Sequence, residues 1–273
     1  MTKRAHISVP GVSSRGDGAR GITRALPDEV PVALVYNGAT QAVMMATPAD
    51  LEDFARGFSL SEGIVSDPAQ LGEIEIVEQL QGIEARMWLS PERAAAMAER
   101  RRAMAGPVGC GLCGIDSLQQ AIRPLPRVAA PDLRWNRDVI ASAPDQLRAH
   151  QQLHDRTHAA HAAGFLRPDG TLVAVREDVG RHNALDKLIG ALAASREDPG
   201  TGAVVMTSRV SVELVQKCAL AGIPVLIAVS APTARAVEIA QAAGITIAAF
   251  ARKGAFDLYA HPSRIETGAH DVA

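Results

Sequence analysis

The chain has 273 residues, with 47% hydrophobic and 21% charged residues, which is typical of a globular protein and argues against wholesale disorder. Its formal net charge of −2 gives no bulk attraction to nucleic acid or to an anionic membrane. No uninterrupted apolar stretch approaches the roughly 20 residues that a membrane helix needs, so we expect neither nucleic acid nor a membrane as a partner. Three cysteines are too few for a disulfide framework, which indicates a reducing, cytoplasmic location.

The chain opens with a polar segment that contains no apolar run. We therefore expect a disordered tail over 1–24 and no signal peptide. Val30–Tyr36 is a predicted strand, and Asn37-Gly38 is a hairpin signal that leads into a return strand over Gln41–Ala46.

A helix is predicted to begin at Thr47-Pro48, a capping residue followed by proline, and to end at Gly63. The elements predicted after it are two paired strands and a polar, arginine-rich helix: Gly72–Glu78, Gly82–Leu89 and Pro91–Met104. We therefore expect a small α+β domain over 25–130 that ends in a cysteine loop.

A larger α/β domain is expected over 131–273. It begins with a helical pattern over Ala143–Ala163. After that, strand and helix patterns alternate over Leu172–Val175, Ala184–Ala194, Ala203–Met206, Val210–Ala221, Val225–Val229, Thr233–Ala243 and Ile245–Phe250. This alternation predicts a largely parallel sheet with crossover helices. Gly222 and Gly244 stand where two of the helices should end.

Polar residues follow each predicted strand of this domain, in the segments 176–183, 207–209, 230–233 and 251–254. Ligands of open α/β sheets bind beyond the carboxyl ends of the strands, where helix N-termini also point. Arginines and hydroxyl groups at that edge suit an anion such as phosphate, although serine and threonine also cap ordinary helices. The densest cluster is Arg181-His182-Asn183, since a helix should start directly behind it.

The loop Gly109-Cys110-Gly111-Leu112-Cys113-Gly114 matches several known patterns. The dinucleotide fingerprint G-x-G-x-x-G and a thioredoxin-like dithiol both require a preceding strand, whereas a polar helix precedes this loop. A zinc deaminase would place a histidine upstream, where only His6 occurs. A structural zinc would need further ligands, and His154, His158 and His161 share one face of the predicted helix. The simplest alternative is a pair of buried cysteines in a glycine turn.

A mobile, nucleophilic thiol fits this loop best. Four glycines at 106, 109, 111 and 114 permit positive φ and free movement. A helix that starts near Asp116 lowers the pKa of a nearby thiol through its N-terminal field. A thiolate attacks sulfane sulfur much as it attacks a disulfide. The third cysteine, Cys218, lies among apolar residues of a predicted helix and is expected to be core packing.

These residues resemble the formate dehydrogenase accessory sulfurtransferases, the FdhD family, over about Glu29 to Ile265. The segments that carry the resemblance are Thr47-Pro48 through Ser61-Glu62-Gly63, the Gly109–Gly114 loop, the block from Glu177 to Lys187, Ser208-Arg209-Val210-Ser211, Ala221–Val225, Ser230-Ala231-Pro232-Thr233 and Phe250-Ala251-Arg252. The block D-V-G-R-H-N-A-x-D-K together with C-G-x-C is long and specific.

The resemblance implies a homodimer whose larger domain is similar to the cytidine deaminase fold, without the deaminase zinc site and with no metal of its own. It implies that the loop accepts sulfur from a cysteine desulfurase and passes it to molybdenum bis-guanine-dinucleotide cofactor, a bound substrate, before that enters formate dehydrogenase. Cys110 would hold the persulfide and Cys113 would assist. The residues expected to contact the cofactor are Phe250, Ala251, Arg252, Lys253, Gly254 and Ala255, together with Arg181, His182, Asn183, Ser208 and Arg209.

Three departures from the family pattern affect details of this expectation. Thr157-His158-Ala159, ahead of His161, stands where the family usually has T-G-G, which suggests a stiffer loop. Asp257 replaces the usual asparagine and adds a negative charge near the expected phosphate site. Thr207 stands where the family often has serine.

Two other functions remain open from the residues alone. In the first, the protein is a chaperone that holds and delivers the cofactor while its cysteines merely shape a loop. In the second, suggested by fold kinship alone, it is a zinc-dependent nucleobase hydrolase.

Overall fold

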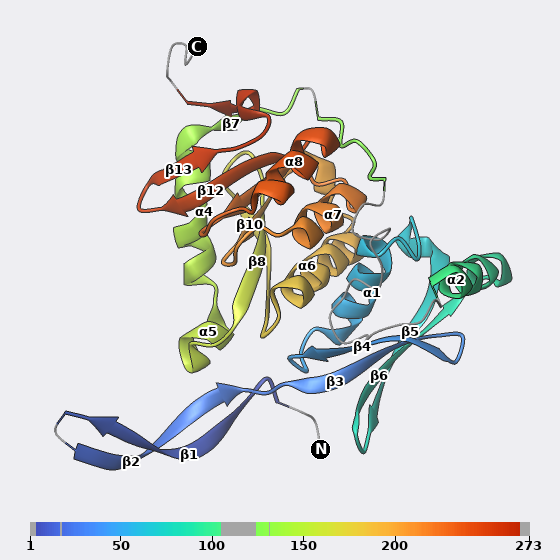
Figure 1. Cartoon of the computed structure of the whole chain (residues 1–273), viewed down its shortest axis with the longest axis vertical. Helices are drawn as coiled ribbons and strands as arrows, with labels where there is room; N and C mark the ends of the chain where they lie inside the picture. Colours follow the sequence, from blue (N-terminus) through green and yellow to red (C-terminus); the bar gives the residue numbers. More distant parts are fainter. Residues whose placement is uncertain (1–3, 17, 105–123, 131, 268–273) are drawn as a thin grey trace.

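The computed structural model describes residues 4–16, 18–104, 124–130 and 132–267. Figure 1 shows a smaller part built on a four-stranded sheet, a larger part built on a six-stranded sheet, and a thin two-stranded projection. The expected mixed α/β fold is confirmed. No helix within the described ranges is both long and apolar enough to cross a membrane.

The projection is an antiparallel hairpin of β1 (His6–Arg15) and β2 (Gly18–Pro27), which we call the arm. The expectation of a disordered tail is wrong for these residues. Isolated apolar residues such as Ile7 and Val9 alternate with small ones along β1, and this period-2 pattern is weak beside the many serines and glycines. The serine- and glycine-rich composition therefore led to a prediction of disorder where the structure has two strands.

The smaller sheet contains β3 (Val30–Tyr36), β4 (Ala39–Ala46), β5 (Leu71–Gln79) and β6 (Gly82–Leu89), in the order β4-β3-β6-β5. The predicted turn at Asn37-Gly38 is confirmed, and both residues have positive φ, 48° and 80°. Helix α1 (Leu51–Ser61) packs its apolar residues on one face of this sheet, and α2 (Pro91–Met104) has the predicted bounds.

The larger sheet has the order β13-β12-β11-β10-β8-β9. Its strands are β8 (His161–Leu166), β9 (Leu172–Asp178), β10 (Ala203–Met206), β11 (Val225–Ala228), β12 (Thr246–Arg252) and β13 (Ala255–Leu258). The helices are α4 (Arg137–Ala149), α5 (Gln152–Thr157), α6 (Arg181–Ser195), α7 (Val212–Leu220) and α8 (Ala234–Ala243). Helix α4 packs on one face, and α6, α7 and α8 cover the other with a larger apolar core. Small strands β7 (Trp135–Asn136) and β14 (Ile265–Glu266) pair beside it.

Two expectations for this part are wrong. The sheet is not largely parallel, because only β10–β11 and β11–β12 pair in parallel and the other three pairings are antiparallel. The segment Ala143–Ala163 is not one helix, because α4 and α5 are followed by strand β8. The alanines of β8 favour a helix intrinsically, yet the strand is almost fully buried between β9 and β10. Tertiary pairing therefore decides its conformation. The predicted ends at Gly222 and Gly244 are confirmed, with φ of 75° and 79°.

The two parts are joined where α1 crosses α6. At Gly57 an added Cβ would lie 1.7 Å from the Asp186 carbonyl oxygen, and at Gly190 it would lie 1.9 Å from that of Asp53. These distances are far shorter than any real carbon–oxygen contact. Only glycine at these positions allows the two backbones to approach so closely.

Buried ion pairs reinforce this junction. Lys187 and Asp178 are fully buried, and their Nζ and Oδ2 atoms lie 2.7 Å apart. Lys187 also donates to the Thr47 carbonyl oxygen, and the Thr47 N–H donates to Asp178 at 3.0 Å. Thr47 thus holds the smaller part onto the larger one, and this is why α1 begins only at Leu51 and not at the predicted Thr47-Pro48.

A second pair involves Asp186, the residue directly before Lys187 in α6. Lys217 of α7 contacts Asp186 at 3.0 Å and Glu62 at 2.7 Å, and Ser61 donates to Asp186. Burial opposes the charged ammonium, but the carboxylates of Asp186 and Glu62 outweigh this effect and raise the pKa of Lys217. Both lysine clusters join the smaller part to the larger.

His158 ends α5 in the left-handed region, with φ of 54°. This conformation costs a non-glycine residue about 1–2 kcal/mol, partly offset by the greater entropy of an unfolded glycine. We expect His158→Gly to raise the free energy of unfolding by about 0.5–1 kcal/mol, measured by urea denaturation. His150 ends α4 with φ of −109°, so His150→Gly is the matched control and should destabilise the protein. Equal destabilisation by both variants would contradict this prediction.

Candidate functional site

The polar segments that follow the strands meet at one edge of the larger sheet. Strands β10, β11 and β12 are parallel, while β8 pairs antiparallel with both β10 and β9. Strand β9 therefore runs in the same direction as β10, and the start of β8 lies at the same edge as the ends of the others. We call this the carboxyl edge.

Backbone hydrogen bonds make the carboxyl edge continuous. They join neighbouring strand ends as follows: Thr207 N–H to the Ala162 oxygen at 3.2 Å, Val210 N–H to the Ala231 oxygen at 3.1 Å, and Phe250 N–H to the Ser230 oxygen at 3.3 Å. The N-termini of α6, α7 and α8 follow directly from these segments. Helix N-termini present a partial positive charge, so the edge is suited to anions.

His182 and Glu213 form a hydrogen-bonded pair at this edge. Nε2 of His182 lies 2.7 Å from Oε2 of Glu213, and each side chain is about a quarter exposed, at 26% and 29%. They come from the first turns of α6 and α7. The hydrogen bond from His182 lowers the pKa of Glu213 below its ordinary value. The carboxylate thus orients the imidazole, an arrangement suited to proton transfer. Sequence reasoning missed Glu213, although its place just after the helix-capping Ser211 was a usable indication.

His161 is a further residue of the carboxyl edge that the sequence did not assign to it. As the first residue of β8 it lies opposite Asp178, and its Nδ1 is 3.4 Å from the Thr207 hydroxyl oxygen. Burial lowers the pKa of His161, and the positive charge of Arg181 lowers it further. A neutral imidazole therefore stands beside the charged groups of the edge.

The three histidines considered as zinc ligands do not share a helical face. His154 lies in α5, His158 follows it in the left-handed conformation, and His161 belongs to β8. His154 and His158 make an edge-to-face ring contact, with centroids 5.6 Å apart. That basis for a zinc site is wrong.

Some expected cofactor contacts have side chains that are engaged inside the protein. Asn183 is 3% exposed, and its amide donates to the Met45 carbonyl oxygen and to Asp178. Ser208 is also buried and donates to the carbonyl oxygen of Arg209, and Ala251 is buried in the core. Direct contact between these side chains and a ligand stays a prediction. Arg209 itself is exposed, whereas Arg181 and His182 are half-buried.

The segment Phe250–Ala255 forms the end of β12 and its turn into β13. Phe250 is 37% exposed and has φ of 52°, which is rare for an aromatic residue. Lys253 and Gly254 also have positive φ, and the pairing of β12 with β13 shifts register between Ala249 and Arg252. Strained backbone of this kind is concentrated at functional sites. Arg252, Lys253, Gly254 and Ala255 are exposed, so two cations face solvent beside an aromatic ring.

The predicted catalytic cysteines, Cys110 and Cys113, lie outside the described residues. Cys218, by contrast, is fully buried in α7. Burial raises the pKa of its thiol to about 12, so it is not nucleophilic at neutral pH. The prediction that Cys218 is core packing is confirmed.

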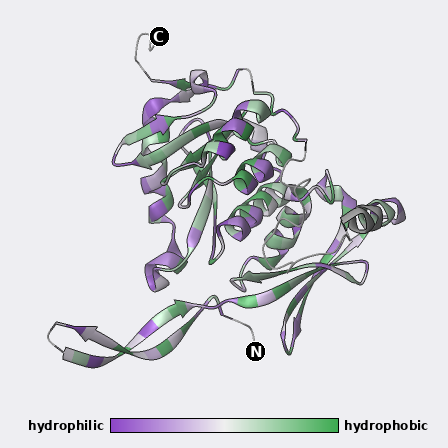
Figure 2. Cartoon of the chain, in the orientation of Figure 1, coloured by the Kyte–Doolittle hydropathy of each residue, from purple (hydrophilic) through white to green (hydrophobic). Residues whose placement is uncertain are grey.

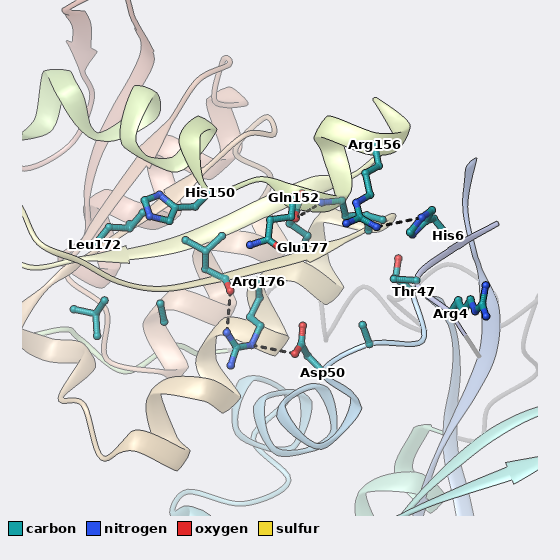
Figure 3. A pocket seen from close by; sticks show the side chains of 16 residues that line it. Arg4, His6, Thr47, Asp50, His150, Gln152, Arg156, Leu172, Arg176 and Glu177 are labelled. Carbon is teal, nitrogen blue, oxygen red and sulfur yellow. Dashed lines mark hydrogen bonds and ion pairs between the residues drawn. The ribbon is translucent and has the colours of Figure 1, made fainter. Parts of the chain in front are cut away.

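A separate pocket of about 660 Å³ runs along the outer side of β9 (Figure 3). Arg4, Arg156 and Arg176 line it, and Arg176 is bound to Asp53 at 2.7 Å. Glu177 accepts two N–H groups from the first turn of α5. The acidic groups here are engaged within the protein, and none of the predicted site residues lines this pocket.

A family model described as the FdhD/NarQ family matches residues 27–266. The chain belongs to the FdhD/NarQ family. The match covers the cysteine loop, the carboxyl edge and both buried lysine clusters, and it begins at the last residue of the arm. The FdhD/NarQ assignment agrees with the resemblance noted in the sequence.

Named relatives are similar over most of their length. A "Sulfur carrier protein FdhD" from Cupriavidus necator is 55% identical over 239 residues, which is 88% of this chain and 83% of that protein. One of the same name from Agrobacterium fabrum is 51% identical over 242 residues, 89% of each. A crystal structure from Desulfotalea psychrophila, described as a formate dehydrogenase accessory protein, superposes with a TM-score of 0.76. It covers 96% of this chain and 100% of that one at 24% identity, so it supports the fold.

Proposed function

We propose that this protein carries sulfur as a persulfide on Cys110 and delivers it to the molybdenum cofactor of formate dehydrogenase. The observation that carries the proposal is the 55% identity to a relative named sulfur carrier protein FdhD, joined to a Cys-x-x-Cys loop flanked by glycines. The third cysteine is buried and unreactive, so the loop holds the cysteines suited to the chemistry.

In the loading step, the thiolate of Cys110 attacks the terminal sulfur of a persulfide on a cysteine desulfurase. A new sulfur–sulfur bond forms on Cys110, the bond in the donor breaks, and the donor cysteine leaves as a thiolate. In the release step, the thiolate of Cys113 attacks the sulfur atom of Cys110. Hydrosulfide leaves, a Cys110–Cys113 disulfide remains, and a cellular dithiol later reduces that disulfide. The two cysteine thiols thereby supply the two electrons that convert sulfane sulfur to sulfide.

The carboxyl edge is the proposed place for the nucleotide ends of the cofactor, which is bound as a substrate. Arg181, Arg252 and Lys253 supply positive charge, and three helix N-termini supply further N–H donors. The exposed ring of Phe250 offers a surface on which a guanine can stack. A pyrophosphate with an attached purine matches this combination of cations and an aromatic ring.

The remaining parts of the proposal concern the fold family, the location and the partners. The larger part is proposed to be cytidine deaminase-like, which is supported by its antiparallel β8–β9 pair beside three parallel strands. We propose a cytoplasmic homodimer that has no metal of its own. Its partners are a cysteine desulfurase and formate dehydrogenase.

The decisive test is intact-protein mass spectrometry after incubation with a cysteine desulfurase and cysteine. We expect wild type to gain the mass of one sulfur atom, reversibly with reductant, and Cys110→Ala to gain none. Cys113→Ala should load sulfur and keep it, because the resolving thiol is missing. Cys218→Ser is the control and should load like wild type. If none of these proteins gains sulfur although the desulfurase is active, the result would favour the cofactor chaperone instead.

A further inference from the structure

The arm has two chemically different faces. Side chains alternate along paired strands, and the register pairs Ile7 with Leu26, Val9 with Arg24 and Ser13 with Arg20. One face therefore carries the three arginines of the arm and most of its large apolar side chains: Ile7, Val9, Ile22, Leu26, Arg15, Arg20 and Arg24. The other face carries His6, Val12 and otherwise small residues or prolines. We call the first of these the charged face of the arm.

The charged face is turned away from its own chain. His6, on the opposite face, lies 3.5 Å from a guanidinium nitrogen of Arg156 in α5. Ile7 and Leu26 are 49% and 42% exposed, and the three arginines are exposed. An isolated two-stranded hairpin is marginal in water. The charged face, with apolar residues visible along the arm in Figure 2, therefore needs a partner surface.

The smaller sheet has an uncovered outer face of complementary character. Helices α1 and α2 pack against its inner side, and in Figure 1 both lie on the same side of it. On the outer face Val43, Met45 and Trp88 are 51%, 47% and 46% exposed. No described residue buries them. Exposed apolar areas of this kind mark interaction sites.

Acidic residues border this outer face. The register places Val43, Ala33 and Glu84 in one row across the sheet, and Val35, Arg86 and Glu75 in the next. Glu73 is on the same side of β5 as Glu75. Three glutamates against the one arginine give the face a charge of −2. The stretch His6–Pro27 has three arginines and a single acidic residue, Asp17.

We propose that two copies of this chain exchange arms, so that the charged face of each arm lies on the outer face of the partner's smaller sheet. Contact between two arms would oppose arginines to arginines, and contact between two outer faces would oppose glutamates to glutamates. The pocket along β9 lies against the base of the chain's own arm, where Arg4 and His6 line it (Figure 3). Its carboxylates are already engaged, Asp50 by Arg176 and Glu177 by N–H groups of α5, so it offers no free acidic surface to a partner's arm. Contact between the arm of one copy and the outer face of the other copy's smaller sheet pairs opposite charges and also covers apolar surface on both sides. When both copies make this contact, the assembly is a closed two-fold dimer.

This inference deepens the homodimer part of the proposed function by naming its contact surfaces. The test is sedimentation velocity of the full chain at physiological ionic strength. Arg20→Glu with Arg24→Glu is expected to raise the dissociation constant of the dimer at least tenfold, and so is Glu73→Arg with Glu75→Arg. Ser8→Glu with Thr23→Glu places the same two glutamates on the opposite face of the arm without removing an arginine, and is expected to leave the dimer intact.

Mixing gives the sharpest readout. The arm variant and the sheet variant should each be monomeric alone, yet form a mixed dimer, because both arm–sheet contacts then pair opposite charges. A wild-type monomer, or variants that all dimerise as tightly as wild type, would overturn the inference. Circular dichroism on each variant confirms that the fold is kept. Persulfide loading of Cys110 is measured separately, so the sulfur-carrier proposal stands or fails independently of this result.

Discussion

Gly57→Ala is expected to lower the free energy of unfolding by about 3 kcal/mol or more. The added Cβ would lie 1.7 Å from the Asp186 carbonyl oxygen, which is backbone of α6 and has no rotamer to change. Helices α1 and α6 would have to separate. That separation would also weaken the buried contacts between Thr47 and Lys187.

Urea denaturation followed by circular dichroism measures this effect. Glu52→Ala is a suitable control, since Glu52 is exposed on the same helix and the change should cost a few tenths of a kcal/mol. Gly190→Ala should resemble Gly57→Ala, because its Cβ would meet Asp53 in the same crossing. Wild-type stability in both glycine variants would show that the helices are further apart than the structure has them.

Lys187→Met is expected to destabilise the protein by about 3–5 kcal/mol, because it leaves the Asp178 carboxylate buried without a counter-charge. Asp178 would keep the N–H groups of Thr47 and Gly180 as donors, which do not replace the lost ammonium. Adding Asp178→Asn should recover part of the loss, since a neutral amide is cheaper to bury than an unpaired carboxylate. A double-mutant cycle from urea denaturation gives the coupling energy.

The exposed Lys253→Met is the matched control for this cycle and should change stability by less than about 0.5 kcal/mol. Additive effects of the two changes, with no coupling between Lys187 and Asp178, would contradict the assignment of this pair as the joint between the two parts. Lys187 belongs to the block D-V-G-R-H-N-A-x-D-K. The cycle therefore also tests whether this block stabilises the fold.

The block D-V-G-R-H-N-A-x-D-K shows how far sequence reasoning reached. The sequence located it correctly between a strand and a helix, at the carboxyl edge of the sheet. Of its polar residues, however, Asp178, Asn183, Asp186 and Lys187 are buried and hold the two parts together. Arg181 and His182 remain at the edge. A motif does not show by itself which of its side chains face a ligand and which face the core.

Other outcomes have equally local causes. The strands and helices from β10 to β12 were predictable from the sequence. Each is a buried run of apolar residues, and glycines mark the turns between them. Strand β8 and the arm could not be predicted, since alanine, serine and glycine carry little strand preference. The pairing of His182 with Glu213 joins residues 31 positions apart in sequence on two different helices.

The sequence by itself determined the family, the α/β class, the alternation of the larger part and the Cys-x-x-Cys loop, because these depend on local periodicity and on rare residues at fixed spacing. Only the tertiary structure decided which faces remain open. The uncovered outer face of the smaller sheet and the charged face of the arm depend on how strands pair and where helices pack. Such contacts form between residues distant in sequence, and no local pattern specifies them.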